Sequence, residues 1–531
     1  MHRTKQFFIG LSVTALLLHG MLGVNTVEAQ TKKQIKKSGA QLKIGIRDAV
    51  HSALTNNFDI LISKSEPLIA EKNLGLAESE FDLSLFGSVN RTVSITPSTS
   101  AFASPEIGEV SSDTISLGFK QKLQPGTVYQ LSLETVTKDN NSTFSGVNPE
   151  YDSYLQLSIS QPLLKGMGWN INTTNIFIAK NTKKINENRY KMNVMQTLTA
   201  TSDAYWDMVY LLKELEVQKE SLERAKDFLH RIELQVEVGV LAPIEIVAAK
   251  AFVAVREESL IGIRHMINNN QDRLKSMANF QDAPPGSTVN LLPIDEPKYK
   301  PVKLNVEELK ELAYKNHPSY AQAKLLVANK ERGLKYNRNQ LLPKVELQGL
   351  VKLKGVRGDA QPVVGFDGTT TQSIFDGTAS DSLSDMSGGD YYDYSVGVVA
   401  EIPLFNRAGR NLAAKSQIEY NTSRTSLKNV KQAIDLEVLK SVRDVDTAEQ
   451  RILATRASRK LAKEKLDAET KKYKVGTSTS FAVLEYQKDL TVETSKEVKA
   501  VIDHVKALSH LELATGTVLK NNGIVLEFAV E

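Results

Sequence analysis

The sequence predicts an α+β membrane protein in which long antiparallel coiled-coil helices continue into a transmembrane β-barrel. Three observations lead to this fold class. The chain begins with an export signal, two long helical stretches have an apolar repeat near 3.5 residues, and two inserts alternate between apolar and polar residues.

The export signal covers residues 1–29. Arg3 and Lys5 precede a mostly apolar run over residues 7–18, and small residues flank Glu28 at the expected cleavage point after Ala29. An uncleaved anchor is the alternative, but the run is short for a membrane span.

Composition narrows the function. The chain has 531 residues, 66 Lys and Arg against 62 Asp and Glu, and no Cys. Without a concentrated basic stripe, we expect no nucleic-acid partner. The lack of Cys excludes disulfides, thiolate catalysis, Cys-ligated metals and a lipid-modified N-terminal Cys.

The chain reads as two similar halves. Residues 70–76 (AEKNLGL) resemble 328–334 (ANKERGL), and the Pro-Leu and Val-Gly pairs of the first half recur in the second in the same order. The first repeat covers residues 30–280 and the second covers 306–520. A Pro-rich linker or collar at 281–305 separates them, and a tail follows at 521–531.

Each half has the same predicted order of elements. A helix (46–80; 306–342) precedes a β insert (81–165; 343–405), a long helix (172–238; 408–475), a tight turn and a return helix (244–280; 480–516). The long helices carry apolar residues at alternating steps of four and three, which predicts a supercoil. The clearest positions are Val194, Leu198, Tyr205, Met208, Ile434, Val438, Val445 and Ile452.

The β inserts have a period of two, as in Leu155, Leu157 and Ile159. Such strands suit a membrane barrel with a wet lumen or the edge of a soluble sandwich, and the export signal and long helices favour the barrel. The first insert holds four strand-like runs, at 81–95, 114–123, 127–137 and 153–161. The acidic segment 355–390 is interpreted as a solvated outer loop, since the ligand spacing of an EF-hand is missing.

No catalytic constellation is found. The sequence contains no P-loop, no His-Glu-x-x-His and no Gly-x-Ser-x-Gly, and its eight His are scattered. We therefore predict no enzyme activity, no catalytic residues, no cofactor and no metal site.

Together these features resemble the TolC-like outer-membrane efflux protein family. The more specific motifs are Gln161-Pro162-Leu163-Leu164, Ile402-Pro403-Leu404-Phe405 and Tyr473-Lys474-Val475-Gly476-Thr477. The resemblance implies a homotrimer in which each subunit gives four strands to one 12-stranded barrel, embedded in outer-membrane lipid, and its helices to a periplasmic tunnel. Two strands of the first insert suffice for this share, so the hairpin around Pro125-Gly126 has no assigned place.

The resemblance also implies site residues at the periplasmic tip of the tunnel. Gate or selectivity roles fall on Glu245, Tyr473 and Glu485, while the family's gate Arg is replaced by Ser478. Glu485 is alternatively a solvated carboxylate, and the two turn glycines are alternatively simple helix caps. The expected docking positions for a periplasmic membrane-fusion adaptor are Val238, Gly239, Val240, Leu241, Val475, Gly476, Thr477 and Ser478.

The predicted function is a passive outer-membrane exit duct of a tripartite efflux pump or a type I secretion system. Its further partner would be an inner-membrane pump of the RND or ABC type. The rival hypothesis is an exported coiled-coil stalk, which explains the long helices but not the repeated strand inserts.

Overall fold

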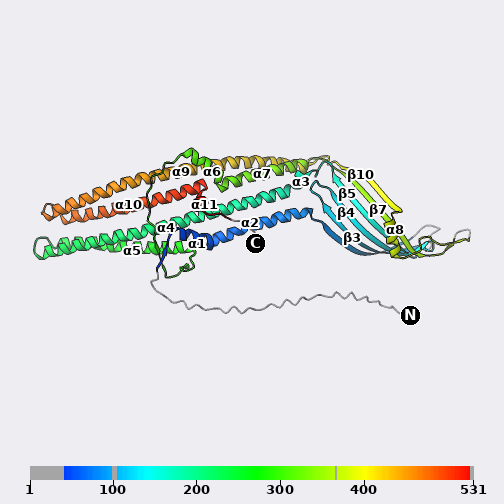
Figure 1. Cartoon of the computed structure of the whole chain (residues 1–531), viewed down its shortest axis with the longest axis horizontal. Helices are drawn as coiled ribbons and strands as arrows, with labels where there is room; N and C mark the ends of the chain where they lie inside the picture. Colours follow the sequence, from blue (N-terminus) through cyan, green and yellow to red (C-terminus); the bar gives the residue numbers. More distant parts are fainter. Residues whose placement is uncertain (1–40, 98–104, 365–367, 527–531) are drawn as a thin grey trace, which may run out of the picture.

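A computed structural model describes residues 41–97, 105–364 and 368–526. Long helices occupy one end of the molecule, a curved sheet occupies the other, and short elements pack beside the helices midway (Figure 1). The predicted export signal at 1–29 lies outside the described residues.

Two helical hairpins make up the long end. The helix α4 (Thr174–Glu237) returns as α5 (Ile244–Ala278), and α9 (Arg407–Lys474) returns as α10 (Ser480–Thr515). With 64 and 68 residues, α4 and α9 are each about 100 Å long at 1.5 Å per residue. These bounds agree within a few residues with the sequence prediction.

The predicted heptad positions form the seams between the helices. In α4, Val194, Leu198 and Tyr205 are almost fully buried, and in α9 the same holds for Val438 and Ile452. Alternating steps of four and three keep such a seam facing its partner along a supercoil.

The shorter helices at the sheet side depart from the prediction. Instead of one helix over 46–80, the chain forms α1 (Ile46–Asn56), α2 (Phe58–Glu78) and a 3-10 turn, η1 (Ser79–Phe81). Instead of one helix over 306–342, it forms α6 (Val306–Asn316) and α7 (Pro318–Asn339). Each break coincides with a new N-cap.

The caps explain the breaks. Asn57 adopts an extended conformation and its side chain accepts a hydrogen bond from the amide of Ile60, which starts α2 afresh. His317 caps α7 in the same way, and Pro318 lacks the amide hydrogen that a continuous helix would need. The paired breaks are a further likeness between the two halves.

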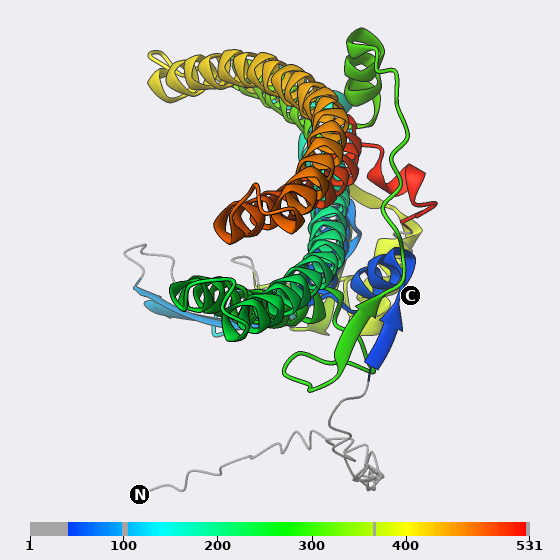
Figure 2. The ribbon, with the colours of Figure 1, turned by 90° about the vertical axis from the view of Figure 1, so that its left-hand side faces the viewer.

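The helices form a single curved layer. Near the tips α9 packs on α10, α10 on α4, and α4 on α5; nearer the sheet the order is α9, α7, α4 and α2. Viewed along its length the layer is an arc, with the short elements on its convex side (Figure 2). The two free edges of the arc are therefore α9 on one side and the stacked pair α2 and α5 on the other.

The predicted linker forms part of a collar on the convex side. Its strand β6 (Asn290–Pro293) pairs in parallel with β1 (Gln41–Ile44), and the helix α11 (Val518–Asn521) follows the second hairpin. The carboxylate of Asp295 accepts hydrogen bonds from Tyr205 Oη and the amide of Ile46, both at 2.6 Å. Burial raises the pKa of Tyr205, so this phenol stays a donor and ties the collar to α4.

The sheet has six antiparallel strands in the order β10-β7-β5-β4-β3-β2. Four come from the first insert and two from the second; their bounds are β2 (Ser84–Pro97), β3 (Ile107–Lys122), β4 (Val128–Asn140), β5 (Val147–Pro162), β7 (Lys344–Ala360) and β10 (Tyr391–Glu401). The sheet therefore has two strands more than the four per subunit that the resemblance implies for the barrel. The hairpin around Pro125-Gly126 is the β3–β4 pair, and it lies inside the sheet between β2 and β5.

The acidic segment after β7 is more ordered than predicted. It contains the short strands β8 (Val363–Val364) and β9 (Thr370–Thr371) and the helix α8 (Ala379–Gly388). Thr378 and Asp381 form a capping box at the start of α8. The interpretation as a wholly solvated loop is wrong, because α8 packs on β5 and β7.

Candidate functional site

Both hairpin tips end in a glycine with left-handed backbone geometry. Gly239 has φ of 80° and Gly476 has φ of 82°, values that a residue with a Cβ rarely adopts. The carbonyls of Gln235 and Lys472 then accept amide hydrogen bonds from Leu241 and Thr477. The predicted turns are thus C-caps, and this structural role is independent of any partner.

Most of the predicted docking positions are exposed on the two turns, but Leu241 is partly buried and packs against the apolar cluster beneath them. The side chains of Val238 and Val475 are 73% and 74% exposed, and Val240 and Thr477 are exposed as well. Apolar side chains held in water at the end of a long helical rod are a suitable surface for a partner. Their role in docking an adaptor remains a prediction.

Beneath the turns, an apolar cluster joins all four helices. Its buried residues are Phe228 and Ile232 of α4, Ala249 of α5, Leu466 of α9, and Val483 and Leu484 of α10. Partly buried aromatic rings, including those of Tyr473 and Phe252, pack against it. The two tips of one subunit are therefore a single packed unit.

Tyr473 crosses from the second hairpin to the first. Its hydroxyl donates a hydrogen bond to Gln235 Oε1 at 2.6 Å, and its ring centroid lies 5.4 Å from that of Phe228. Burial raises the pKa of Tyr473, and the nearby carboxylate of Glu245 raises it further. The phenol is therefore neutral at physiological pH and available as a donor.

Glu245 makes the second polar link between the hairpins. Its carboxylate accepts a hydrogen bond from the buried hydroxyl of Ser480 at the start of α10. Ser478, which stands where the family has Arg, instead donates to Glu469 within its own hairpin at 2.6 Å. Within the described residues, the hydroxyl groups of Tyr473 and Ser480 both donate hydrogen bonds across the two tips.

Glu485 is partly compensated in charge. Lys488 Nζ lies 2.8 Å from its carboxylate, one helical turn away. Arg256 of α5 is buried with its guanidinium 5.3 Å from the ring centroid of Phe252, and burial lowers the pKa of Arg256 while Glu485 opposes this shift. The gate or selectivity role of Glu485 remains a prediction, and these cations weaken the field of its carboxylate.

Sequence reasoning missed Gln235, Ser480 and Arg256. Gln235 precedes the glycine of the first turn by four residues, and Ser480 follows the glycine of the second turn by four. Their symmetric closeness to the turns was the available signal. Which of them meets Tyr473 or Glu245 depends on how the hairpins pack.

At the other end of the molecule, the sheet has an apolar face and a polar face. One row of cross-strand partners is apolar throughout: Leu85, Phe119, Leu131, Leu157, Val351 and Tyr394. On the opposite face, Lys138 pairs with Asp152 and Glu150, and Lys354 pairs with Asp393. A wall between lipid and water requires this division.

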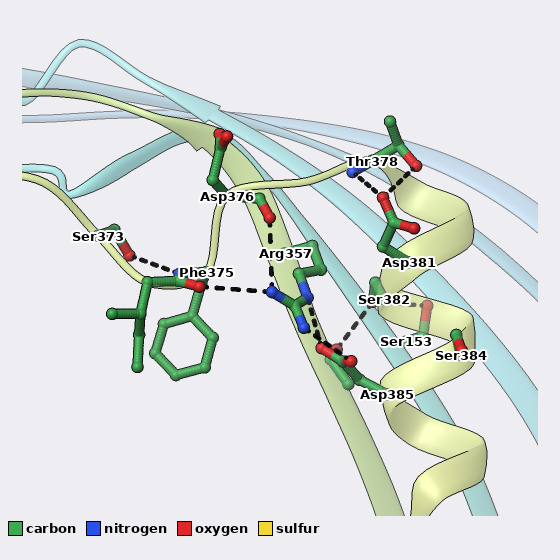
Figure 3. Close-up of polar contacts among 12 residues, drawn as sticks. Ser153, Arg357, Ser373, Phe375, Asp376, Thr378, Asp381, Ser382, Ser384 and Asp385 are labelled. Atoms are coloured by element: carbon green, nitrogen blue, oxygen red, sulfur yellow. Dashed lines mark hydrogen bonds and ion pairs between the residues drawn. The ribbon is translucent and has the colours of Figure 1, made fainter.

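Helix α8 covers part of the apolar face, over β5 and β7 at the end of the sheet far from the long helices (Figure 1). Ser382 lies against Ser153 at 2.9 Å, and Arg357 points toward Asp385 with hydrogen bonds of 2.6 and 2.9 Å (Figure 3). A Cβ at Gly355 would lie 1.9 Å from the carbonyl oxygen of Ser382, so only glycine allows this approach. On β2 the same face stays open, and its exposed side chains include Ile95.

Among the described residues, no helix combines the length and hydrophobicity needed to cross a membrane. Within that part of the chain, no group of three or more His, Asp or Glu side chains is placed to hold a metal ion.

Long helical hairpins joined to a two-faced sheet define a TolC-like protein. The outer membrane efflux protein family model matches residues 49–279 and 309–517, most of the chain. The chain belongs to the outer membrane efflux protein family. A comparison with curated proteins found no match.

Solved structures share the fold at low sequence identity. The chain is similar to a membrane protein from Pseudomonas aeruginosa, with a TM-score of 0.63, 15% identity, and coverage of 89% of this chain and 93% of that one. For the outer membrane protein VceC from Vibrio cholerae, the TM-score is 0.62, the identity 14% and the coverage 89% and 96%. For the Campylobacter jejuni CmeC outer membrane channel, these values are 0.59, 14%, 90% and 88%.

Proposed function

We propose that the protein is the outer-membrane exit duct of a tripartite efflux pump or a type I secretion system. The observation that carries this proposal is that one chain combines two hairpins, each with one helix about 100 Å long, and a curved sheet with one apolar and one polar face. The sheet suits a membrane wall, and the helices suit a tunnel that reaches through the periplasm.

The duct is a homotrimer in this proposal, because both edges of the helical layer expose apolar side chains that a neighbouring copy would cover. At one edge α2 exposes Phe58, Ile62, Ile69 and Leu76. These residues are spaced by four, seven and seven, the spacing of a coiled-coil seam. The long helix α9 at the opposite edge exposes Ile418, Leu436 and Leu461. Packing α9 of one copy on α2 and α5 of the next covers both sets.

The duct moves substrates passively. Energy comes from an inner-membrane pump of the RND or ABC type, which a periplasmic membrane-fusion adaptor connects to the exposed turns at Val238–Leu241 and Val475–Ser478. Paired charges on the polar face of the sheet give hydrated solutes a path without a tight binding site. The repeated sheet inserts and antiparallel hairpins weigh against a coiled-coil stalk.

Membrane fractionation followed by planar-bilayer recording tests this function. The full chain should enter the outer-membrane fraction, resist salt extraction and, once purified in detergent, produce discrete conductance steps. A matched sample unfolded before reconstitution controls for detergent leaks. Recovery in the soluble fraction, or conductance no greater than in this control, would overturn the proposal.

A further inference from the structure

We propose that all six strands of each subunit join the barrel wall, with β2 of one copy pairing with β10 of the next, so that three copies close an 18-stranded barrel. The inference rests on the trimeric duct proposed above. It differs from the 12-stranded barrel implied by the resemblance because the β3–β4 hairpin is counted as wall.

Strand pairing places the hairpin in the wall. β3 pairs with β2 from Ser84 opposite Lys120 to Pro97 opposite Ile107, and β4 pairs with β5 from Val128 opposite Ser160. The hairpin thus separates β2 from β5 over nearly their full length. Without it, β2 and β5 would have to pair directly.

Side-chain chemistry gives the hairpin the same two faces as the other strands. Phe119 and Leu131 continue the apolar row from Leu85 on β2 to Leu157 on β5. The next row adds Leu117 and Leu133, which are also cross-strand partners. A hairpin lying in water beside the barrel would have no need for this match, since exposed apolar rows there are a liability.

The turn between β3 and β4 is hydrogen-bonded to the junction between the sheet and the helices. The carbonyl of Pro125 accepts a hydrogen bond from the Gly168 amide at 3.0 Å, and Gln121 donates to the carbonyl of Phe81 at 2.8 Å. A Cβ at Gly126 would lie 2.6 Å from the carbonyl oxygen of Gly166. The turn of the hairpin therefore lies at the edge of the sheet where the other strands continue into helices.

The two edge strands are complementary. Since all neighbours in the six-stranded sheet are antiparallel, β2 and β10 run in opposite directions. Both strands are exposed along almost their whole length, so their outer amides and carbonyls need partners in lipid. A second copy can supply these in antiparallel register, and the even strand number lets the ring close without a parallel pair.

The proposed barrel is wide. Barrel diameter grows nearly linearly with strand number, so 18 strands give a diameter about half as large again as 12 strands, in the range of porins that hold an aqueous channel. The narrowest point of the duct then lies at the hairpin tips, and the barrel passes any cargo that the tips admit, including extended polypeptide.

Engineered disulfides test the proposed contact between β2 and β10 of neighbouring copies. The chain has no Cys of its own that could form competing disulfides. Oxidation in outer-membrane vesicles is applied to full-length variants carrying Val396→Cys on β10 with Leu85→Cys, Val89→Cys or Val93→Cys on β2. All four positions lie on the apolar face. At least one pair should link copies into covalent dimers and trimers and nothing larger. Val396→Cys with Leu131→Cys on the central strand β4 is the matched control and should not link copies.

A second set of Cys variants tests whether the β3–β4 hairpin is part of the barrel wall. Leu131→Cys with Leu157→Cys should close within one chain, because these residues are direct partners on β4 and β5. Leu85→Cys with Leu157→Cys should stay open. If Leu85 instead links to Leu157 while β2 still links to β10 of another copy, the trimeric duct is supported and the proposal of six wall strands per subunit is overturned. If no β2–β10 pair links copies, the trimeric duct itself is overturned.

Discussion

Removing the hydroxyl of Tyr473 tests the idea that the two hairpin tips are held together as a gate. Tyr473→Phe keeps the ring against Phe228 and deletes only the hydrogen bond to Gln235. A hydrogen bond of this kind contributes about 0.5–1.5 kcal/mol net. If the three subunits of the proposed trimer open together, the losses add to about 1.5–4.5 kcal/mol, with each subunit counted as independent.

This free energy should appear in the closed–open equilibrium. Because 1.4 kcal/mol corresponds to about a tenfold change, Tyr473→Phe should raise the ratio of open to closed duct by about ten- to a thousandfold. Single-channel recording in planar bilayers measures that ratio directly. Trimer content and melting temperature should change little, since the apolar cluster beneath the tips stays intact.

Tyr486→Phe is the matched control. Tyr486 packs on the same cluster, with Lys465 over its ring at 4.2 Å, but its hydroxyl forms no hydrogen bond across the hairpins in the part of the chain the structure describes. Equal open probability in wild type, Tyr473→Phe and Tyr486→Phe would show that the hydrogen bond between Tyr473 and Gln235 does not stabilise the closed duct.

Three further outcomes are expected. Glu485→Gln should lower cation selectivity, read from the reversal potential under a salt gradient; an unchanged potential would exclude this carboxylate from the pore. Gly355→Val should weaken the packing of α8 by about 1–3 kcal/mol and expose the loop to protease, whereas Gly349→Val, whose Cβ meets nothing within 4 Å, should not; equal cleavage of both would contradict the docking of α8. The hydrogen bond that His510 Nε2 donates to the carboxylate of Asp203 raises the pKa of His510, so the stability this bond adds is complete below about pH 6.5 and is lost as pH rises through the raised pKa. His510→Gln should therefore lower the melting temperature at pH 6 more than at pH 8.5, and a pH-independent difference would reject this linkage.

The helical part of the fold could be predicted because its signal is local and repeated. Heptads such as Val194, Leu198 and Tyr205 recur over the whole of α4, and the turn glycines mark where each hairpin reverses. The breaks at Asn57 and His317 were missed because a single capping side chain interrupts an otherwise continuous pattern.

The sheet was only partly predictable. All four strands of the first insert were visible as alternating runs, but the order in which they pair depends on contacts between distant segments, and the resemblance gave no place in the sheet to the β3–β4 hairpin. Helix α8 was missed because its Ser- and Asp-rich sequence has low helix propensity. Its packing depends on small residues, Ser153 and Gly355, that carry no periodic signal.

At the tips, the resemblance pointed to Glu245 and Tyr473, but their partners could not be predicted. Gln235 and Ser480 meet them only because two hairpins far apart in the sequence pack side by side. The same packing brings Arg256 near Glu485, so the carboxylate of Glu485 has a neighbouring cation that the sequence did not reveal.

If this chain assembles as a trimeric duct, electron microscopy of the protein extracted from outer membranes with detergent should show particles with three-fold symmetry, in which a helical rod about 100 Å long continues into a wider ring. Compact monomers, or long unbranched fibres, would rule out this assembly.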